Sequence, residues 1–372
     1  MQEDFHYYAT YCAAFISGYS PEESHDIAYC AQLVDLCSKA FLSKIHGSQI
    51  AATTQLQLEL AEARTDLIGL QDITRIWSSF HFLPRDLYAK KEKRGRKYMN
   101  KFRLICGPNG DLLLETVKLA RNKGLQAVGL AMHVLADTWA HMYFAGTPSL
   151  VINNTDKYFY DIFEENGEVV ERQIKFRHSA SSPDDLEKSL YTNSIYQLDE
   201  NSIMNLGHGR AGHLPDYSFA KYKYLPAWGD YNFIIKDNPS DYMHAFCQMI
   251  YAMKYLRGEY DSFEKEKYDE AAVEPYRERI DGIFRKRQLN SSADWKEFGR
   301  ELSGVEIEDF DIERYQEEYI TASKSQKEDT FLGNFIRAAI AQKGMVTNAI
   351  FQSKNKLAGY SKVKVSSDSL KG

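Results

Sequence analysis

Apolar residues recur every three or four positions over most of the chain, which is the spacing of amphipathic helices. This pattern predicts a mainly α protein in which helices supply most of the core. The predicted helical runs are 5–45 as two helices, about 48–80, 112–144 with a break at 122–124, 241–257, and a highly charged region that continues to about 345.

The boundary between the first two helices carries a start signal. Ser20 directly precedes Pro21, and Glu23 lies three residues beyond the serine. A serine side chain can cap the free N–H groups of a helix start, proline suits the first helical position, and a glutamate at this distance completes a capping box. The second helix is therefore expected to begin at Pro21.

Residues 146–205 depart from the helical pattern. The segments 158–163 and 169–176 are rich in aromatic and β-branched residues, and Glu165-Asn166-Gly167 separates them. Asn-Gly between two such segments is a strong β-hairpin signal. The sequence thus predicts a small β-hairpin insertion in a helical protein.

The chain divides into three predicted parts. Residues 1–260 form a helical domain that contains the insertion, and 261–345 form a charged helical extension. Residues 346–372 become rich in Lys and Ser, which favours a flexible tail. The Lys- and Arg-rich segment 90–101 is expected to be an exposed loop.

Composition excludes several classes of protein. A hydrophobic share of 44% over 372 residues is that of a globular chain, and a net charge of −6 gives no overall attraction to nucleic acid or anionic membrane. No stretch reaches the roughly 18 consecutive apolar residues of a membrane helix, and no basic leader with a hydrophobic run is present, so a cytoplasmic protein is expected. The five cysteines form no C-x-x-C pair, which predicts buried thiols rather than disulfides or a cysteine-rich zinc site.

One predicted helix carries the spacing His133-x-x-x-Asp137-x-x-x-His141. Residues four apart lie along one stripe of a helix, and at about 1.5 Å rise per residue the two histidines are about 12 Å apart along its axis. Metal–ligand bonds of about 2.1 Å do not allow one ion to use both histidines easily. The spacing therefore favours at least two metal ions, with Asp137 able to bridge them through its two oxygens.

Other segments supply further nitrogen and oxygen ligands. The loop Gly207–Asp216 holds His208, His213 and Asp216 among three glycines that permit close backbone approach. Taken singly these side chains have simpler interpretations, since a histidine can be a satisfied core residue, an aspartate can cap a helix, and the loop can be merely exposed. Together they provide the ligands that two or three zinc ions need without thiolates. The upstream candidates are Asp4, His6, Asp35 and His81.

This set of residues resembles the zinc-dependent phospholipase C superfamily, which includes single-strand-specific nucleases. The resemblance spans about residues 4–260, with the His133–His141 element as its most specific part, and it implies an all-helical metal-binding catalytic domain with a trinuclear zinc site. The whole chain also resembles a family of uncharacterised bacterial proteins that share the Asp4-Phe5-His6-Tyr7-Tyr8 opening and the 207–216 loop. In chain order the superfamily's ligands correspond to His6, Asp35, His81, His133, Asp137, His141, and then His208 or His213 with Asp216.

The resemblance also implies a mechanism. Asp137 would bridge two zinc ions whose shared water attacks phosphorus in line, while another zinc stabilises the leaving oxygen. Asp35 would act as a ligand, a base or both, and Arg210 would pair with a phosphate oxygen, or be simply a loop charge. Secreted members use their terminal amine as a ligand; this chain begins Met-Gln, so Asp4 is the candidate for that place.

Three alternatives remain open on the sequence. Ser24-His25-Asp26 permits an HD-type phosphohydrolase, and Glu22-x-x-His25 a carboxylate-bridged di-iron bundle, although a second Glu-x-x-His motif is missing. A protein of another class would use zinc only for structure and bind a partner through the insertion and the extension. The substrate is equally open among phospholipids, nucleic acids, cyclic nucleotides and small phosphodiesters.

Overall fold

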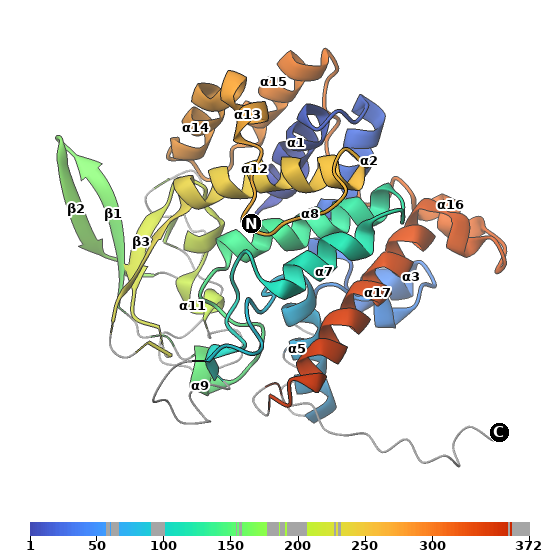
Figure 1. The fold of residues 1–372 in the computed structure, drawn as a ribbon, viewed down its shortest axis with the longest axis horizontal. Coiled ribbons are helices and arrows are strands. Elements are labelled where there is room, and N and C mark those ends of the chain that lie inside the picture. Colours follow the sequence, from blue (N-terminus) through green and yellow to red (C-terminus); the bar gives the residue numbers. More distant parts are fainter. Residues whose placement is uncertain are drawn as a thin grey trace.

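The computed structural model describes residues 1–56, 67–90, 101–153, 158–176, 207–226 and 232–355, together with isolated positions between these ranges. The protein is mainly helical, as the sequence predicted, with a small antiparallel sheet at one side of the helices (Figure 1). Helices from the amino-terminal and carboxyl-terminal parts of the sequence pack against helices from its central part.

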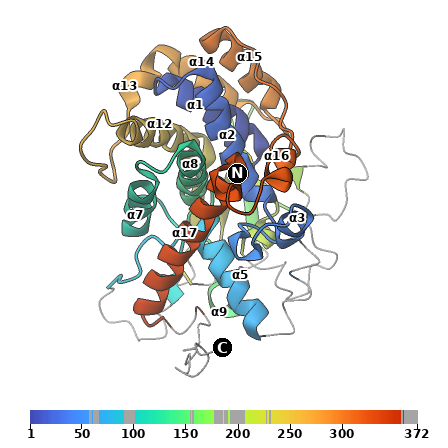
Figure 2. The ribbon, with the colours of Figure 1, turned by 90° about the vertical axis from the view of Figure 1, so that its right-hand side faces the viewer.

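Two helices, α2 (Pro21–Leu36) and α8 (Leu125–Ala140), form the centre of the core. They approach closely at Gly129, where an added Cβ would lie 2.2 Å from the carbonyl oxygen of Ile27. Every residue of α8 from Ala127 onward is buried. Helix α1 (Thr10–Ile16) packs on α2, and α12 (Asn238–Leu256) packs on α8 (Figure 2).

The predicted cap of α2 is confirmed. The Ser20 hydroxyl accepts a hydrogen bond from the Glu23 N–H at 3.1 Å, and the Glu23 carboxylate accepts one from the Ser20 N–H at 2.9 Å. The predicted extent to residue 45 is wrong, because α2 ends at Leu36 and Ser38 caps a separate short helix, α3 (Lys39–Lys44).

The predicted break before α8 is also confirmed. Helix α7 (Asp111–Ala120) ends before Asn122 and Gly124, whose φ angles of 62° and 88° cannot continue a helix. The predicted run over 48–80 is only partly helical: a 3-10 turn, η2 (Gln49–Ala51), is followed by α5 (Leu67–Phe80). Residues 57–59 and 61–66 lie outside the described part of the chain.

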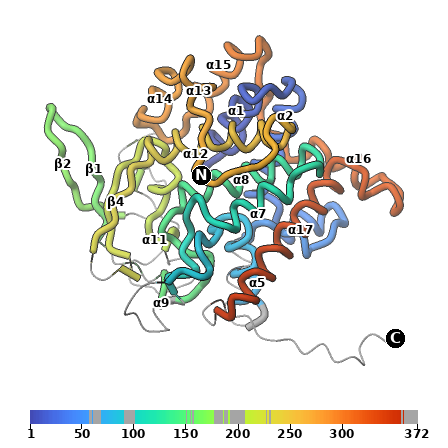
Figure 3. Tube along the Cα trace, viewed as in Figure 1, coloured from blue at the N-terminus to red at the C-terminus, as the bar shows by residue number. Residues whose placement is uncertain are grey.

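The predicted hairpin is present, but the sheet is larger than the sequence indicated. Positive φ angles at Asn166 and Gly167 form its turn. The strands are β1 (Phe159–Glu165), β2 (Glu168–Gln173), β3 (Lys221–Tyr224) and β4 (Ile234–Asp237), in the antiparallel order β2-β1-β3-β4. Strands β3 and β4 follow the predicted insertion in the sequence. Strand β3 pairs with β1 of the hairpin, and β4 pairs with β3 (Figure 3).

The predicted carboxyl-terminal extension packs into the same core as the first helices. Trp295, Phe335 and Ile350 belong to one apolar cluster with Phe5 and Leu33. The last helix continues to Gln352, past residue 346 where a tail was predicted, and residues 356, 357 and 359–372 lie outside the described part. The elements here are α13 (Glu270–Val273), η5 (Glu274–Tyr276), α14 (Arg277–Arg285), α15 (Ser292–Ser303), α16 (Gln316–Thr321), η6 (Lys327–Asp329) and α17 (Phe331–Gln352).

Two further expectations concern the whole chain. All five cysteines are buried and free, as predicted. Among the described helices, none has both the length and the apolar character required to cross a membrane.

Most of the predicted loop 90–101 lies outside the described residues.

Candidate metal centre

Side chains from five separate segments converge beside the carboxyl-terminal half of α8. They come from a π-helical turn at the start of the chain, from the end of α2, from the residue after α5, from α8 itself, and from the short elements α11 (His208–Ala211) and η4 (Leu214–Asp216). The turn is η1 (Asp4–Ala9). The residues brought together are His6, Asp35, His81, His133, Asp137, His141, His208 and Asp216.

Asp137 lies at the centre of this cluster, and its two carboxylate oxygens face different neighbours. Oδ1 lies 3.2 Å from His6 Nε2. Oδ2 lies 3.2 Å from both His81 Nδ1 and His133 Nε2. This is the arrangement of a carboxylate that can hold two cations at once.

The candidate ligands form three groups, in each of which the nitrogen and oxygen atoms lie within 4.8 Å of one another. His133 belongs to two groups and His141 to the third, so the two histidines of the α8 ladder face different places, as their spacing suggested. The groups are His6, His133 and Asp137; Asp35, His81 and His133; and His141, His208 and Asp216.

The distances within these groups are compatible with a shared metal ion. Asp35 Oδ1 lies 3.7 Å from His81 Nδ1 and 3.8 Å from His133 Nε2, and His208 Nε2 lies 3.2 Å from Asp216 Oδ1. Two ligand atoms on a tetrahedral zinc ion, with bonds of about 2.1 Å, are separated by about 3.4 Å. The His208–Asp216 pair is also within hydrogen-bond distance, whereas the two Asp35 pairs are too long for hydrogen bonds.

Backbone carbonyls fix the orientation of three of the histidines. His81 Nε2 lies 2.9 Å from the Thr53 carbonyl, His133 Nδ1 2.8 Å from that of Ala31, and His141 Nδ1 2.7 Å from that of His81. A carbonyl only accepts, so each of these nitrogens carries the ring proton. The other nitrogen of each neutral ring therefore presents a lone pair, and His133 Nε2 and His81 Nδ1 do so only 3.3 Å from each other.

His6 is the most isolated member of the cluster. Both of its ring nitrogens are buried and have no hydrogen-bond partner among the described residues, although the ring stacks on His133 with centroids 3.8 Å apart. Burial, and then the neighbouring His133 ring and the terminal amine, lower the pKa of His6 to about 4. Burial also lowers the pKa of His141 to about 4. Both rings are thus neutral near pH 7, which is the state that binds metal.

The two buried carboxylates are ionised. Burial alone would raise the pKa of Asp137, but His141, the terminal amine and His133 together hold it well below its usual value. The pKa of Asp216 is likewise held low, because His208 and the terminal amine outweigh its burial. Two negative charges in a buried site require positive charge nearby, and the terminal amine 2.9 Å from Asp137 Oδ1 supplies part of it.

These shifts predict a pH dependence for protein freed of metal with a chelator. His6 and His141 have pKa values of about 4 in the folded chain against 6.5 in the unfolded chain, so below pH 6.5 only the unfolded state takes up these protons. The free energy of unfolding should therefore fall as the pH is lowered from 6.5 towards 4. The pKa of His81 is raised, since its bond to Asp137 and the charge of Asp35 outweigh burial, and this offsets part of the loss. Urea unfolding at pH 7 and pH 5 measures the difference; equal stability at the two values would contradict it.

Asp4 does not join the cluster. Its carboxylate accepts hydrogen bonds from the Ser291 N–H at 3.1 Å, the Ser291 hydroxyl at 2.7 Å and the Phe5 N–H at 2.8 Å, which accounts for its oxygens without a metal. The α-amino group of Met1 lies in the cluster instead, 2.9 Å from Asp137 Oδ1 and 3.3 Å from both His141 Nε2 and Asp216 Oδ1. The expectation that Asp4 takes the place of the terminal amine is therefore not supported by the geometry.

The 207–216 loop brings in His208 rather than His213. His208 Nε2 lies 3.2 Å from Asp216 Oδ1, and its ring contacts that of His141. His213 is 3.7 Å from the other oxygen of Asp216, and its side chain is 51% exposed. The structure thus separates two candidates that the sequence left equal.

This difference gives a paired prediction. His208→Ala should lower zinc content by up to one ion per chain, because it removes a ligand from the third group, whereas His213→Ala should leave zinc content within error of the parent. Elemental analysis of the two purified variants measures this. Equal zinc loss in the two variants, or loss only in His213→Ala, would reverse the assignment.

Two residues that carried no sequence signal hold Asp216 in place. The Asn238 amide donates to the Leu214 and Tyr217 carbonyls at 2.8 Å and 2.7 Å, and the Tyr242 hydroxyl donates to the Pro215 carbonyl at 3.1 Å. Both lie in α12, so the late ligand is fixed by a helix that contributes no ligand itself. Only the Asn-Pro pair at the start of α12 could have marked this position, and it is a general turn signal.

Arg210 lies outside the three ligand groups. It is buried, and its guanidinium donates to the Thr155 carbonyl at 2.8 Å. The predicted role in phosphate binding is thus not favoured by this geometry, and the contact fits a residue that braces the loop.

The motifs of the alternative enzymes are not part of the cluster. His25 and Asp26 lie near the start of α2, where Arg314 contacts the His25 ring at 3.2 Å and Tyr315 donates to Asp26 at 2.7 Å. Glu22 accepts a hydrogen bond from the Ser20 hydroxyl at 2.9 Å. Within the described residues, none of these acidic or histidine side chains belongs to a ligand group.

Comparison with known families identifies one of unknown function. Residues 1–350 match a family that is described as a family of unknown function, DUF6765. No curated protein and no solved structure matches the chain.

Proposed function

We propose that this chain, which belongs to the DUF6765 family of unknown function, is a zinc-dependent hydrolase of phosphate esters with a di- or trinuclear centre bridged by Asp137. The family assignment itself indicates no activity. The proposal therefore depends on the chemistry of the cluster.

One observation carries the metal part of the proposal. His81 Nδ1, His133 Nε2 and Asp137 Oδ2 lie 3.2 to 3.3 Å from one another, and each presents a lone pair or a negative charge toward the others. Such an arrangement repels itself unless a proton or a metal cation lies among the three atoms. The buried, unpartnered nitrogens of His6 point to the same need in the neighbouring group.

The kind of ligand favours zinc. The donors are imidazole nitrogens and carboxylate oxygens, and the cysteines lie elsewhere as buried free thiols. When bound, zinc ions supply positive charge for the oxygens of a phosphate ester and favour the deprotonation of water near neutral pH.

The chain's own residues take separate roles in this proposal. Asp137 holds the groups together through its two oxygens, and the Thr53, Ala31 and His81 carbonyls keep the histidine lone pairs directed inward. Asp35 has a 29% exposed side chain, so it can contact both an ion and a molecule that enters from solvent. This makes Asp35 the candidate to accept a proton from the attacking water.

Exposure also distinguishes catalysis from a purely structural zinc site. A structural site is closed by protein ligands, whereas a catalytic site keeps a position open. The side chains of Asp35 and His208 are 29% and 20% exposed, on different ligand groups, while those of His6 and His133 are fully buried. Solvent access to two ligands of an otherwise buried cluster favours the catalytic role.

Phosphate esters are favoured over other substrates by the order of the ligands along the chain. That order resembles the zinc-dependent phospholipase C superfamily, and clustered zinc ions suit a displacement that develops charge on the attacking and leaving oxygens. The test is a screen of phosphomonoesters and phosphodiesters, including a phospholipid, a single-stranded oligonucleotide and a cyclic nucleotide, with zinc added. Turnover that a chelator abolishes and zinc restores is expected; zinc-loaded protein with no activity on any of these classes would favour the structural alternative.

A further inference from the structure

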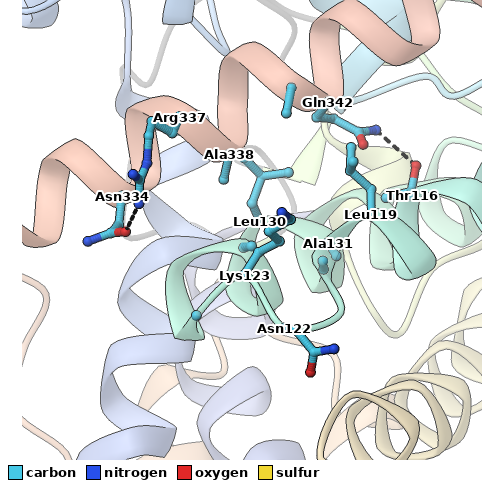
Figure 4. A pocket seen from close by; sticks show the side chains of 14 residues that line it. Thr116, Leu119, Asn122, Lys123, Leu130, Ala131, Asn334, Arg337, Ala338 and Gln342 are labelled. Atoms are coloured by element: carbon cyan, nitrogen blue, oxygen red, sulfur yellow. Dashed lines mark hydrogen bonds between the residues drawn. The ribbon is translucent and has the colours of Figure 1, made fainter. Parts of the chain in front are cut away.

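A pocket lies between α7, α8 and α17, at the end of α8 that precedes the candidate metal centre. Its volume is about 580 Å³, within the range of roughly 300–1,000 Å³ for small-molecule sites. Figure 4 shows the side chains of α17 facing those of α7 and α8 across it. None of the eight clustered ligand residues lines this pocket.

The walls of the pocket are apolar and short. Ala120 comes from α7, Ala127 and Ala131 from α8, and Ala338 and Ala341 from α17. Leu119 and Leu130 complete the apolar lining. Because alanine side chains occupy little space, the three helices leave room for a flat or chain-like apolar group.

The charged side chains that line the pocket are positive. Lys123 and Arg337 are its charged lining residues, and no acidic residue lines it. Neither cation forms an ion pair with a carboxylate in the described ranges, and the side-chain contact of Arg337 is a hydrogen bond to the neutral Asn334 amide. Two uncompensated cations beside an apolar slot complement an anionic head group on an apolar body.

The other end of the pocket is closed by a satisfied polar pair. Gln342 is 1% exposed, and its amide donates to the Thr116 hydroxyl at 2.9 Å and to the Ser79 carbonyl at 3.1 Å. Figure 4 shows the Gln342–Thr116 bond at the opposite end from Asn334 and Arg337. Arg337 and Asn334 thus lie at the end of the pocket away from this polar pair.

We propose that this pocket, the α7–α8–α17 pocket, binds a small amphiphilic anion: a carboxylate, sulfonate or phosphate joined to an apolar body. The anionic group pairs with Lys123 and Arg337, and the apolar body lies along the alanines. Binding requires no metal, so it is separate from the proposed hydrolytic site.

Anilinonaphthalene sulfonate is a suitable probe, and N-phenylnaphthylamine is its uncharged counterpart. A fluorescence titration should show one saturable site per chain for the sulfonate, with at least tenfold weaker binding of the uncharged probe. Chelator treatment should leave the affinity unchanged. No saturable site, equal affinity for both probes, or loss of binding with chelator would overturn the proposal.

Variants locate the site. Lys123→Glu/Arg337→Glu should weaken sulfonate binding at least tenfold, whereas Arg300→Glu/Lys324→Glu, which makes the same charge change at two exposed residues away from the pocket, should stay within twofold of the parent. Ala341→Trp should block binding, because position 341 is exposed at the rim and a larger side chain there fills the slot without entering the core. Circular dichroism checks that each variant is folded. Unchanged affinity in the charge-reversal variant, or an equal loss in its control, would contradict the site.

Discussion

Asp137→Asn should reduce hydrolysis of any accepted phosphate ester by about a thousandfold or more while leaving the protein folded. Asn keeps the size of the side chain but removes the charge and one of the two oxygens that face separate ligand groups. Zinc content should fall by at least one ion per chain. The measurements are kcat with added zinc and elemental analysis of the same preparation.

A matched control separates the loss of a ligand from the loss of a buried carboxylate. Asp161 is also buried, and it accepts a hydrogen bond from Tyr191 at 2.6 Å and pairs with Arg287, away from the cluster. Asp161→Asn should cost some stability and leave zinc content and kcat within about twofold of the parent. Full activity in Asp137→Asn, or an equal loss in the control, would be incompatible with a bridging role.

Removal of metal should produce the second large effect, a fall in the melting temperature of about 10 °C that added zinc reverses. An ion present at about a thousand times its Kd stabilises the folded state by about 4 kcal/mol. Two such ions shift a chain of this length by roughly that temperature. Without them the lone pairs of His81 and His133 and the charge of Asp137 repel one another. Differential scanning calorimetry before and after chelation measures the shift.

His133→Asn/Asp216→Asn is the control for this effect, since these two residues provide a ligand to each of the three groups. Its melting temperature should not respond to zinc. A zinc-dependent rise in this variant equal to that of the parent would place the binding elsewhere on the chain.

Periodicity and turn chemistry predicted much of the fold. The α7–α8 break, the capped start of α2 and the hairpin turn at Asn166 and Gly167 depend on local backbone preferences, and local sequence encodes those directly. The end of α2 and the pairing of β3 and β4 with the hairpin were not predicted. These features depend on packing between distant segments, and a single sequence does not display such contacts.

The candidate ligands were predictable to a similar degree. The fourfold spacing of His133, Asp137 and His141 follows from helix geometry, and the structure places the two histidines in different groups. Whether His208 or His213 reaches the cluster depends on how the 207–216 loop folds. The exclusion of Asp4 depends on how the first residues of the chain pack. The carbonyls of Thr53 and Ala31 orient histidines without any side-chain signal, because every residue carries that group.

The central claim is that several zinc ions occupy the cluster around Asp137, and the direct test is the zinc content of protein purified without chelator. Elemental analysis should give two to three zinc ions per chain for the parent, and fewer for Asp137→Asn. A content below one ion per chain that added zinc does not raise would contradict the account.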